Sequence, residues 1–317
     1  MTVELPLIGF GLPVSGSWAT PDTMRHIASR AEELGYASLW TFQRLLNPVD
    51  ADLGEPHRTV FDSVVALAHV AGCTSRIGLG TATLCAPFTP PALLAKTTAS
   101  LDVLTAGRLT VGLGIGWMPQ EYAAAGVPFT QRGARMDEYL RCLQALWTQD
   151  PVEFDGDFYT VPRSHVAPRP VQQPHPPLLL GGTAAPALRR AGRLAQGWIS
   201  SSHQDLSTVR TCAGLVREGA AAAGRDPSTV RIVVRGVVDL LPSAPPGARR
   251  PLQGTREQIL DDLAALRAHG ATEVFLDLNL LPRVGSPSAD AATSVALAEQ
   301  VLDAFAPTTD SAPAHHG

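Results

Sequence analysis

Residues 76–116 read RIGLGTATLCAPFTPPALLAKTTASLDVLTAGRLTVGLGIG, and this stretch decides the fold class. A short apolar run (76–85) precedes a longer run with helical periodicity (90–105), and a second short apolar run (108–116) follows Gly107. Short apolar runs bounded by turn residues indicate buried strands, and the longer run indicates a helix. The stretch therefore predicts a strand-helix-strand unit whose two strands are parallel.

The same alternation runs through most of the chain. We predict strands over residues 7–12, 36–42, 76–85, 108–116, 177–182, 197–202, 230–241 and 271–279. We predict helices over residues 20–35, 59–72, 90–105, 132–148, 184–195, 206–223, 255–270 and 289–305. Eight strand-helix units in 317 residues favour an α/β fold of the (β/α)8 TIM barrel type over a doubly wound open sheet.

One barrel domain is predicted over residues 1–306, with an insertion at about 150–177. The insertion is rich in proline, and FDGDFY (154–159) has the D-G signal of a small hairpin. Residues 307–317 are small and polar and include proline, so we expect a disordered tail there.

The composition excludes several classes of partner. Lys and Arg number 25 against 29 Asp and Glu, so no basic excess favours nucleic acid or an anionic membrane surface. No apolar run reaches the length of a membrane span. The four cysteines form no C-x-x-C pair, which predicts reduced thiols in a cytoplasmic protein. No His/Asp/Glu set shows metal-ligand spacing, so we expect a small-molecule substrate and no metal site.

The strand at 108–116 carries three glycines, Gly112, Gly114 and Gly116, directly before Trp117. The pattern G-x-G-x-G lies on the fourth strand and lacks the G-x-G-x-x-G spacing of a dinucleotide-binding turn, which excludes that class. Two interpretations remain open. The glycines fill the narrow interior of a barrel, or they leave the strand end bare so that a flat cofactor ring can lie against it.

Several longer stretches carry a resemblance to a known family. They are residues 94–148, which include AGRLTVGLGIGWMPQEY, then RPVQQPHPPLLLGG (169–182), LRRAGRLAQGW (188–198) and GTREQILDDLAALRAHGATEVFLDL (254–278). In these the chain resembles the luciferase-like monooxygenase superfamily, and within it the oxidoreductases that use the deazaflavin coenzyme F420. The resemblance implies a bacterial-luciferase-like barrel, often dimeric, so we expect a homodimer. It also implies a flavin or deazaflavin held at the carboxyl ends of the strands.

The resemblance also implies particular site residues. The family carries a non-proline cis peptide in the segment that matches GTATLCAP (80–87), which corresponds to Ala82–Thr83. The residues expected to bind the cofactor are Thr81, Ala82 and Thr83 beside its ring, Gly114, Gly116 and Trp117 on the next strand end, and Gly181, Gly182 and Thr183 around its phosphate.

Two departures from the family pattern bear on the reaction. The F420-dependent sugar-phosphate dehydrogenases carry an acidic residue and a histidine after the second strand, where this chain has Gln43 and Arg44. Those enzymes also carry a catalytic glutamate where this chain has Trp117. The missing acid and base argue against alcohol oxidation of that type.

The candidate catalytic residues are Arg44 and His203, and the residues expected in the substrate pocket are Gln43, Cys85 and Glu121. Plainer alternatives stay open. Arg44 and Glu121 are equally consistent with salt-bridged residues, Cys85 with a buried thiol, and His203 with a hydrogen-bonded loop histidine. His57 and His165 lie in loops that could line the mouth of the site.

The leading hypothesis is an oxidoreductase that transfers a hydride from reduced F420 to an activated C=C or C=N bond of a small organic substrate. An FMN-dependent luciferase-like monooxygenase is the first alternative, because the superfamily includes both cofactors. A non-catalytic flavin- or deazaflavin-binding protein is the second alternative.

Overall fold

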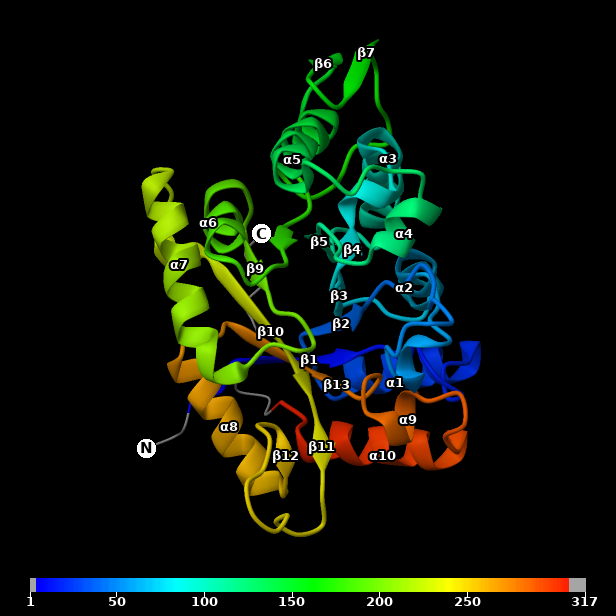
Figure 1. The fold of residues 1–317 in the computed structure, drawn as a ribbon. Helices are drawn as coiled ribbons and strands as arrows, with labels where there is room; N and C mark the ends of the chain where they lie inside the picture. Colours follow the sequence, from blue (N-terminus) through cyan, green and yellow to red (C-terminus); the bar gives the residue numbers. More distant parts are fainter. Residues whose placement is uncertain (1–3, 308–317) are drawn as a thin grey trace.

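A closed parallel barrel forms the centre of the molecule in the computed structural model, which describes residues 4–307 (Figure 1). Its strands are β1 (Leu7–Gly11), β2 (Ser38–Thr41), β3 (Gly78–Thr81) with its continuation β4 (Leu84–Cys85), β5 (Leu109–Gly114), β8 (Leu178–Leu180), β9 (Gly197–Ile199), β10 (Arg231–Val237) and β13 (Glu273–Asp277). Neighbours pair in the order β3-β2-β1-β13-β10-β9-β8-β5, and a β3–β5 pairing closes the ring. The predicted (β/α)8 barrel is confirmed.

Helices surround the strands, as Figure 1 shows. The main helices are α1 (Pro21–Glu33), α2 (Ser63–Ala71), α3 (Pro91–Leu104), α5 (Arg132–Thr148), α6 (Ala185–Leu194), α7 (Val209–Ala222), α8 (Arg256–Ala268) and α10 (Ala291–Ala304). Short helices are α4 (Pro119–Ala124), α9 (Pro282–Gly285) and the 3-10 turns η1 (Glu55–His57), η2 (Ala86–Phe88), η3 (Leu206–Thr208) and η4 (Pro227–Thr229). In the described part of the chain, no helix is long and apolar enough to cross a membrane.

Some predicted boundaries are wrong, and local hydrogen bonds explain why. The helix predicted over 59–72 begins at Ser63, because the Asp62 side chain caps the N–H groups of Val64 and Val65. The helix predicted over 206–223 opens with a separate 3-10 turn, η3. The strand predicted over 230–241 is interrupted, and its last part, β11 (Asp239–Leu240), pairs with β12 (Gln253–Gly254) outside the barrel.

The insertion contains the predicted hairpin, formed by β6 (Val152–Asp155) and β7 (Thr160–Ser164). It projects beyond α5 at the top of Figure 1. Glu138 on α5 accepts the N–H groups of Asp157, Phe158 and Tyr159, which fixes the turn to the helix. The predicted tail at 307–317 lies outside the described residues except for Pro307.

The barrel interior is filled with side chains and forms a floor. Successive residues of a strand point to opposite faces, so alternate residues of each strand point inward. Trp40 and Phe275 stack inside the barrel with ring centroids 5.4 Å apart. They belong to an interior cluster of Trp40, Ala82, Leu179, Ile199, Val233 and Phe275. The Trp40 ring occupies the space that a Cβ on Gly80 would need, so a glycine is required there.

Strand β5 has glycines in place of larger residues because the segment from Thr81 to Cys85 packs closely against it. A Cβ on Gly112 would overlap the carbonyl oxygen of Thr81, and one on Gly114 would lie 2.8 Å from the Thr83 hydroxyl. Gly116 has a φ of +69°, and its Cβ would lie 2.6 Å from the Cys85 sulfur. These glycines make room for the bulged segment between β3 and β4. A cofactor ring lying against this strand end stays a prediction.

Candidate active site

A cavity of about 360 Å³ lies at the carboxyl ends of the barrel strands, directly above this floor. The predicted site residues that line it are Gln43, Arg44, Ala82, Thr83, Cys85, Gly114, Gly116, Trp117, Glu121, Gly181, Gly182 and Thr183. The other lining residues are Phe42, His57, Phe88, Ile115, Ile199, Ser200, Ser201, Ser202 and Arg235. The structure therefore brings most of the predicted site into one place.

Thr81 and His203 do not line the cavity. Thr81 is buried, and its hydroxyl both donates to the Gly112 carbonyl and accepts from the Gly112 N–H, each at 2.9 Å. Its side chain therefore joins β3 to β5, which corrects its expected place beside the cofactor. His203 is exposed in the loop after β9, outside the cavity lining.

The start of helix α6 lies beside the cavity, next to the lining residues Gly181, Gly182 and Thr183. Strand β8 ends at Leu180, and the Gly181-Gly182-Thr183 loop leads into helix α6. The N-cap residue of α6, Ala184, offers no side-chain acceptor. Its carbonyl accepts the N–H groups of Ala187 and Leu188, and Pro186 has no N–H, so the N–H groups of residues 182–185 are the ones left without an acceptor among the described residues. Gly182 has a φ of +132°, and a Cβ there would lie 2.9 Å from the Ala187 Cβ. This uncapped helix start fits a phosphate group.

The predicted cis peptide at Ala82–Thr83 is present in the segment between β3 and β4. The segment is held on both sides. Gln43 accepts the N–H of Cys85 through Oε1 at 2.7 Å, and the Ala82 carbonyl accepts a 3.4 Å hydrogen bond from Arg235 Nη1. Burial raises the pKa of the Cys85 thiol, so this half-buried cysteine stays protonated although it lines the cavity.

Arg44 and Glu121 form an ion pair at the rim. Arg44 Nη1 lies 3.2 Å from Glu121 Oε2, and the two side chains are 10% and 7% exposed. Glu121 Oε1 also accepts the N–H of Leu45 at 2.8 Å. The Arg44 guanidinium lies 5.4 Å from the centre of the Trp117 ring. The salt-bridged alternative is therefore present for both residues, yet both also face the cavity.

His57, given little weight from the sequence, lies in the cavity wall at the end of η1. Burial is the largest influence on its pKa, which is lowered to about 4, and the positive charge of Arg44 and Arg235 lowers it further. The ring is therefore uncharged at neutral pH. His57 Nδ1 is buried with no hydrogen-bond partner among the described residues. His165 instead pairs with Asp150 at 2.7 Å in the insertion.

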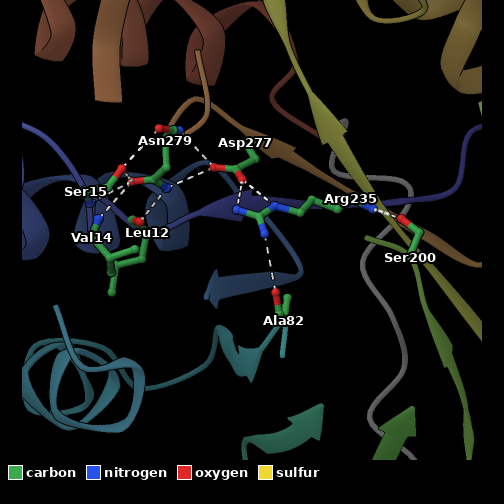
Figure 2. A network of polar contacts seen from close by, with 8 residues as sticks. All are labelled: Leu12, Val14, Ser15, Ala82, Ser200, Arg235, Asp277 and Asn279. Carbon is green, nitrogen blue, oxygen red and sulfur yellow. Dashed lines mark hydrogen bonds and ion pairs between the residues drawn. The ribbon is translucent and has the colours of Figure 1, made fainter. Parts of the chain in front are cut away.

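Arg235 was not predicted from the sequence, and it lines the cavity as a second cation beside Arg44. Its Nε donates to Asp277 Oδ2 at 2.6 Å, and the two side chains are 6% and 1% exposed (Figure 2). A signal was available, because an arginine within the apolar run VRIVVRGVV (230–238) requires a buried partner. The pairing of β10 with β13 could not be read from the sequence; it sets Arg235 opposite Phe275, so that Asp277 lies two residues further along the neighbouring strand.

A chain of hydrogen bonds holds Asp277 in place. Asp277 Oδ1 accepts the backbone N–H and the side-chain N–H of Asn279, both at 2.9 Å. Asn279 in turn accepts the N–H of Val14 at 2.9 Å and donates to the Leu12 carbonyl at 2.9 Å. Figure 2 shows these contacts running from the loop after β1 to Arg235. The guanidinium is therefore held in one orientation before any ligand arrives.

The cavity has the character of a site for an organic cofactor and substrate. Within residues 4–307, no group of three or more His, Cys, Asp or Glu side chains is placed to hold a metal ion. Small and hydroxyl-bearing residues line the cavity together with aromatic and cationic residues. Such a mixture of apolar surface with a few directed polar groups is typical of small-molecule sites.

Known proteins are similar to this chain in sequence. An uncharacterized protein of Mycobacterium tuberculosis is 36% identical over 226 residues, 69% of this chain and 79% of that protein. The FMNH2-dependent dimethylsulfone monooxygenase of Pseudomonas putida is 32% identical over 228 residues, 69% of this chain and 60% of that protein. The F420-dependent glucose-6-phosphate dehydrogenase of Kineococcus radiotolerans is 32% identical over 228 residues, 68% of this chain and 63% of that protein.

Solved structures share the fold. A monooxygenase from Streptomyces bottropensis superimposes with a TM-score of 0.77 at 22% identity, over 94% of this chain and 98% of that one. An F420-dependent secondary alcohol dehydrogenase in complex with an F420-acetone adduct superimposes with a TM-score of 0.75 at 18% identity, over 95% and 99%. The family model described as luciferase-like monooxygenase matches residues 8–242. The chain therefore belongs to the luciferase-like monooxygenase family and is an oxidoreductase of that family.

Proposed function

We propose that this oxidoreductase transfers a hydride from reduced F420 to an activated C=C or C=N bond of a small organic substrate. The observation that carries the proposal is that the carboxylates at the site are already ion-paired. Glu121 is the one carboxylate among the described lining residues, and it is bonded to Arg44 and to the Leu45 N–H. Asp277, beneath the floor, is bonded to Arg235.

Oxidation of an alcohol needs a base that can take the hydroxyl proton. Both carboxylates at the site are already ion-paired. His57 is uncharged, but a pKa of about 4 makes it a weak base at neutral pH. The described lining therefore suits reduction of a substrate better than oxidation of an alcohol.

The residues present fit a deazaflavin with a phosphate-bearing side chain. The Gly181–Thr183 loop and the uncapped start of α6 would hold the phosphate. Ala82, Thr83 and Gly114 would lie beside the ring. When bound, reduced deazaflavin supplies the hydride. Trp117 and Arg44 at the rim would restrict water, and Arg235 would stabilise negative charge that develops on the reacting partners.

An FMN-dependent monooxygenase is the second candidate. It is supported by the Pseudomonas putida relative, which has the same 32% identity as the F420-dependent relative. The uncapped start of α6 suits the phosphate of FMN as well as that of F420. The two candidates differ in which cofactor binds tightly, and that difference is measurable.

Titration of the purified protein with oxidised and reduced F420 and with FMN, without oxygen, tests the proposal. We expect F420 to bind at least about tenfold more tightly than FMN. Gly182→Val should lose at least about tenfold of that affinity, because the side chain is strained at this φ and fills the loop. Gly214→Ala, in an open position on α7, is the matched control. Tight FMN binding without F420 binding contradicts the proposal.

A further inference from the structure

A cationic wall forms one side of the cavity, and we define it as Phe42, Arg44, His57 and Arg235. Both of its arginines are buried, with side chains 10% and 6% exposed. Burying a guanidinium is costly unless its N–H groups find acceptors. The acceptors that bind these two guanidinium groups therefore indicate which N–H donors remain for a ligand.

The chain satisfies these arginines only in part. A guanidinium has five N–H donors. Arg235 uses its donors on Asp277 and, at 3.4 Å, on the Ala82 carbonyl. Arg44 pairs with Glu121 through Nη1, while Arg44 Nε is buried with no partner among the described residues. Unused donors on two buried cations in the same cavity point to an anionic ligand.

The nearby carboxylates do not cancel this positive character. Glu121 lines the cavity, but its charge is shared between Arg44 and the Leu45 N–H. Asp277 is 1% exposed and does not line the cavity, and its second oxygen is occupied by Asn279. The cavity therefore presents two cations and one well-satisfied carboxylate.

His57 connects the two arginines. Its ring meets the Phe42 ring edge-on at 6.1 Å, and Phe42 lies 4.6 Å from the Arg235 guanidinium carbon. The charged and titratable groups that act on His57 are Arg44, Arg235 and His203, which lower its pKa, and Asp277, which raises it. An anion bound here would offset the arginine charges and let His57 take up a proton.

We propose that the cationic wall binds the anionic group of the substrate, a small organic carboxylate, through Arg44 and Arg235 beside His57. A carboxylate matches the paired N–H donors of a guanidinium. The inference rests on the proposed function in one respect, since it leaves the Gly181–Thr183 loop to the cofactor. Carboxylate binding is linked to proton uptake at His57, so affinity increases as the pH falls below about 6 toward the pKa of His57.

The cofactor-free protein and acrylate, with the neutral isostere acrylamide, test the wall. The readout is the ring NMR signal of His57, assigned with His57→Gln. We expect acrylate to bind at least about tenfold more tightly than acrylamide at pH 7 and to raise the pKa of His57 to about 5 or above. Acrylate should also bind more tightly at pH 5 than at pH 7.

Substitutions then locate the binding. Arg44→Gln is combined with Glu121→Gln, because Arg44→Gln alone would leave the buried Glu121 carboxylate without its partner, and this variant should lose about tenfold of the acrylate affinity. Arg235→Gln alone would leave the Asp277 carboxylate buried without its partner, so Arg235→Gln is combined with Asp277→Asn to remove both charges and keep the chain folded. This second double variant should also lose about tenfold. Arg58→Gln is the matched control, because Arg58 follows His57 directly but is exposed and lies outside the cavity lining.

Equal affinity for acrylate and acrylamide overturns the proposal. The proposal is also overturned if the wild type and the variants of Arg44 with Glu121 and of Arg235 with Asp277 bind acrylate with the same affinity, provided that circular dichroism shows all three proteins folded. Because no cofactor is added, this result and the F420 titration fail separately. A protein that binds acrylate but not F420 keeps its cationic wall and loses only the proposed cofactor.

Discussion

His57 links the electrostatics of the cavity to the stability of the fold. Its pKa is lowered from 6.5 to about 4 by burial first and then by the arginines. Between these pH values the unfolded chain binds a proton at His57 that the folded chain does not, so stability is lost as the pH falls through this range. We expect the Tm of the wild type to fall more between pH 7 and pH 5 than that of His57→Gln. Equal falls in a calorimetric comparison would contradict the lowered pKa.

Single residues show where sequence reasoning was sufficient and where it was not. Arg44 and Glu121 were both expected at the site. Their ion pair could not be predicted, because the two residues lie 77 positions apart in the sequence. Arg235 was missed because its partner Asp277 comes from a neighbouring strand, and the register of two strands cannot be read from either one alone. The family resemblance supplied the Gly181–Thr183 loop, whose roles stay predictions.

At the level of elements, the glycines of β5 are best explained by the close approach of the adjacent β3–β4 segment. The Thr81 carbonyl occupies the space of a Cβ on Gly112, and a backbone atom has little freedom to move away. We expect Gly112→Ala to destabilise the protein by about 3 kcal/mol or more, at the upper end of the cost of overpacking. Chemical denaturation measures this, with Gly214→Ala as a control whose position is open. A loss of less than about 1 kcal/mol would disprove the steric explanation.

The alternation of strand and helix predicted the barrel because both periodicities arise from local geometry. Some boundaries that failed depend on contacts between elements, unlike the local cap at Asp62. Strand β9 was predicted to end at residue 202 but ends at Ile199. After Ile199 the chain leaves the barrel, and Ser200, Ser201 and Ser202 line the cavity. Nothing in the run GWISSS marks that departure, since it depends on where the neighbouring strands end.

For the whole molecule, Asn279 ties the end of the chain's last barrel strand to the loop after its first strand. It bonds to Asp277, Leu12, Val14 and Ser15, all of them buried. We expect Asn279→Ala to lower the free energy of unfolding by about 2–4 kcal/mol, because it leaves several buried polar groups without partners. The loss is measured by denaturant unfolding. A change below about 0.5 kcal/mol would show that the ring closes without this link.

The expected homodimer concerns the whole molecule as well and stays a prediction. Sedimentation velocity of the purified protein measures it directly. A single species at twice the mass of 33.4 kDa agrees with the expectation, and a species at the monomer mass across the concentrations tested contradicts it.

The most direct test of the central claim follows the transferred hydrogen. Reduced F420 carrying deuterium at its transferable position is incubated with the protein and a panel of unsaturated carboxylates, without oxygen, and the products are analysed by mass spectrometry. We expect one deuterium at a former C=C carbon of the product, with turnover lost in Gly182→Val. Turnover that requires both reduced FMN and oxygen, with an oxygen atom added to the product, would contradict the claim.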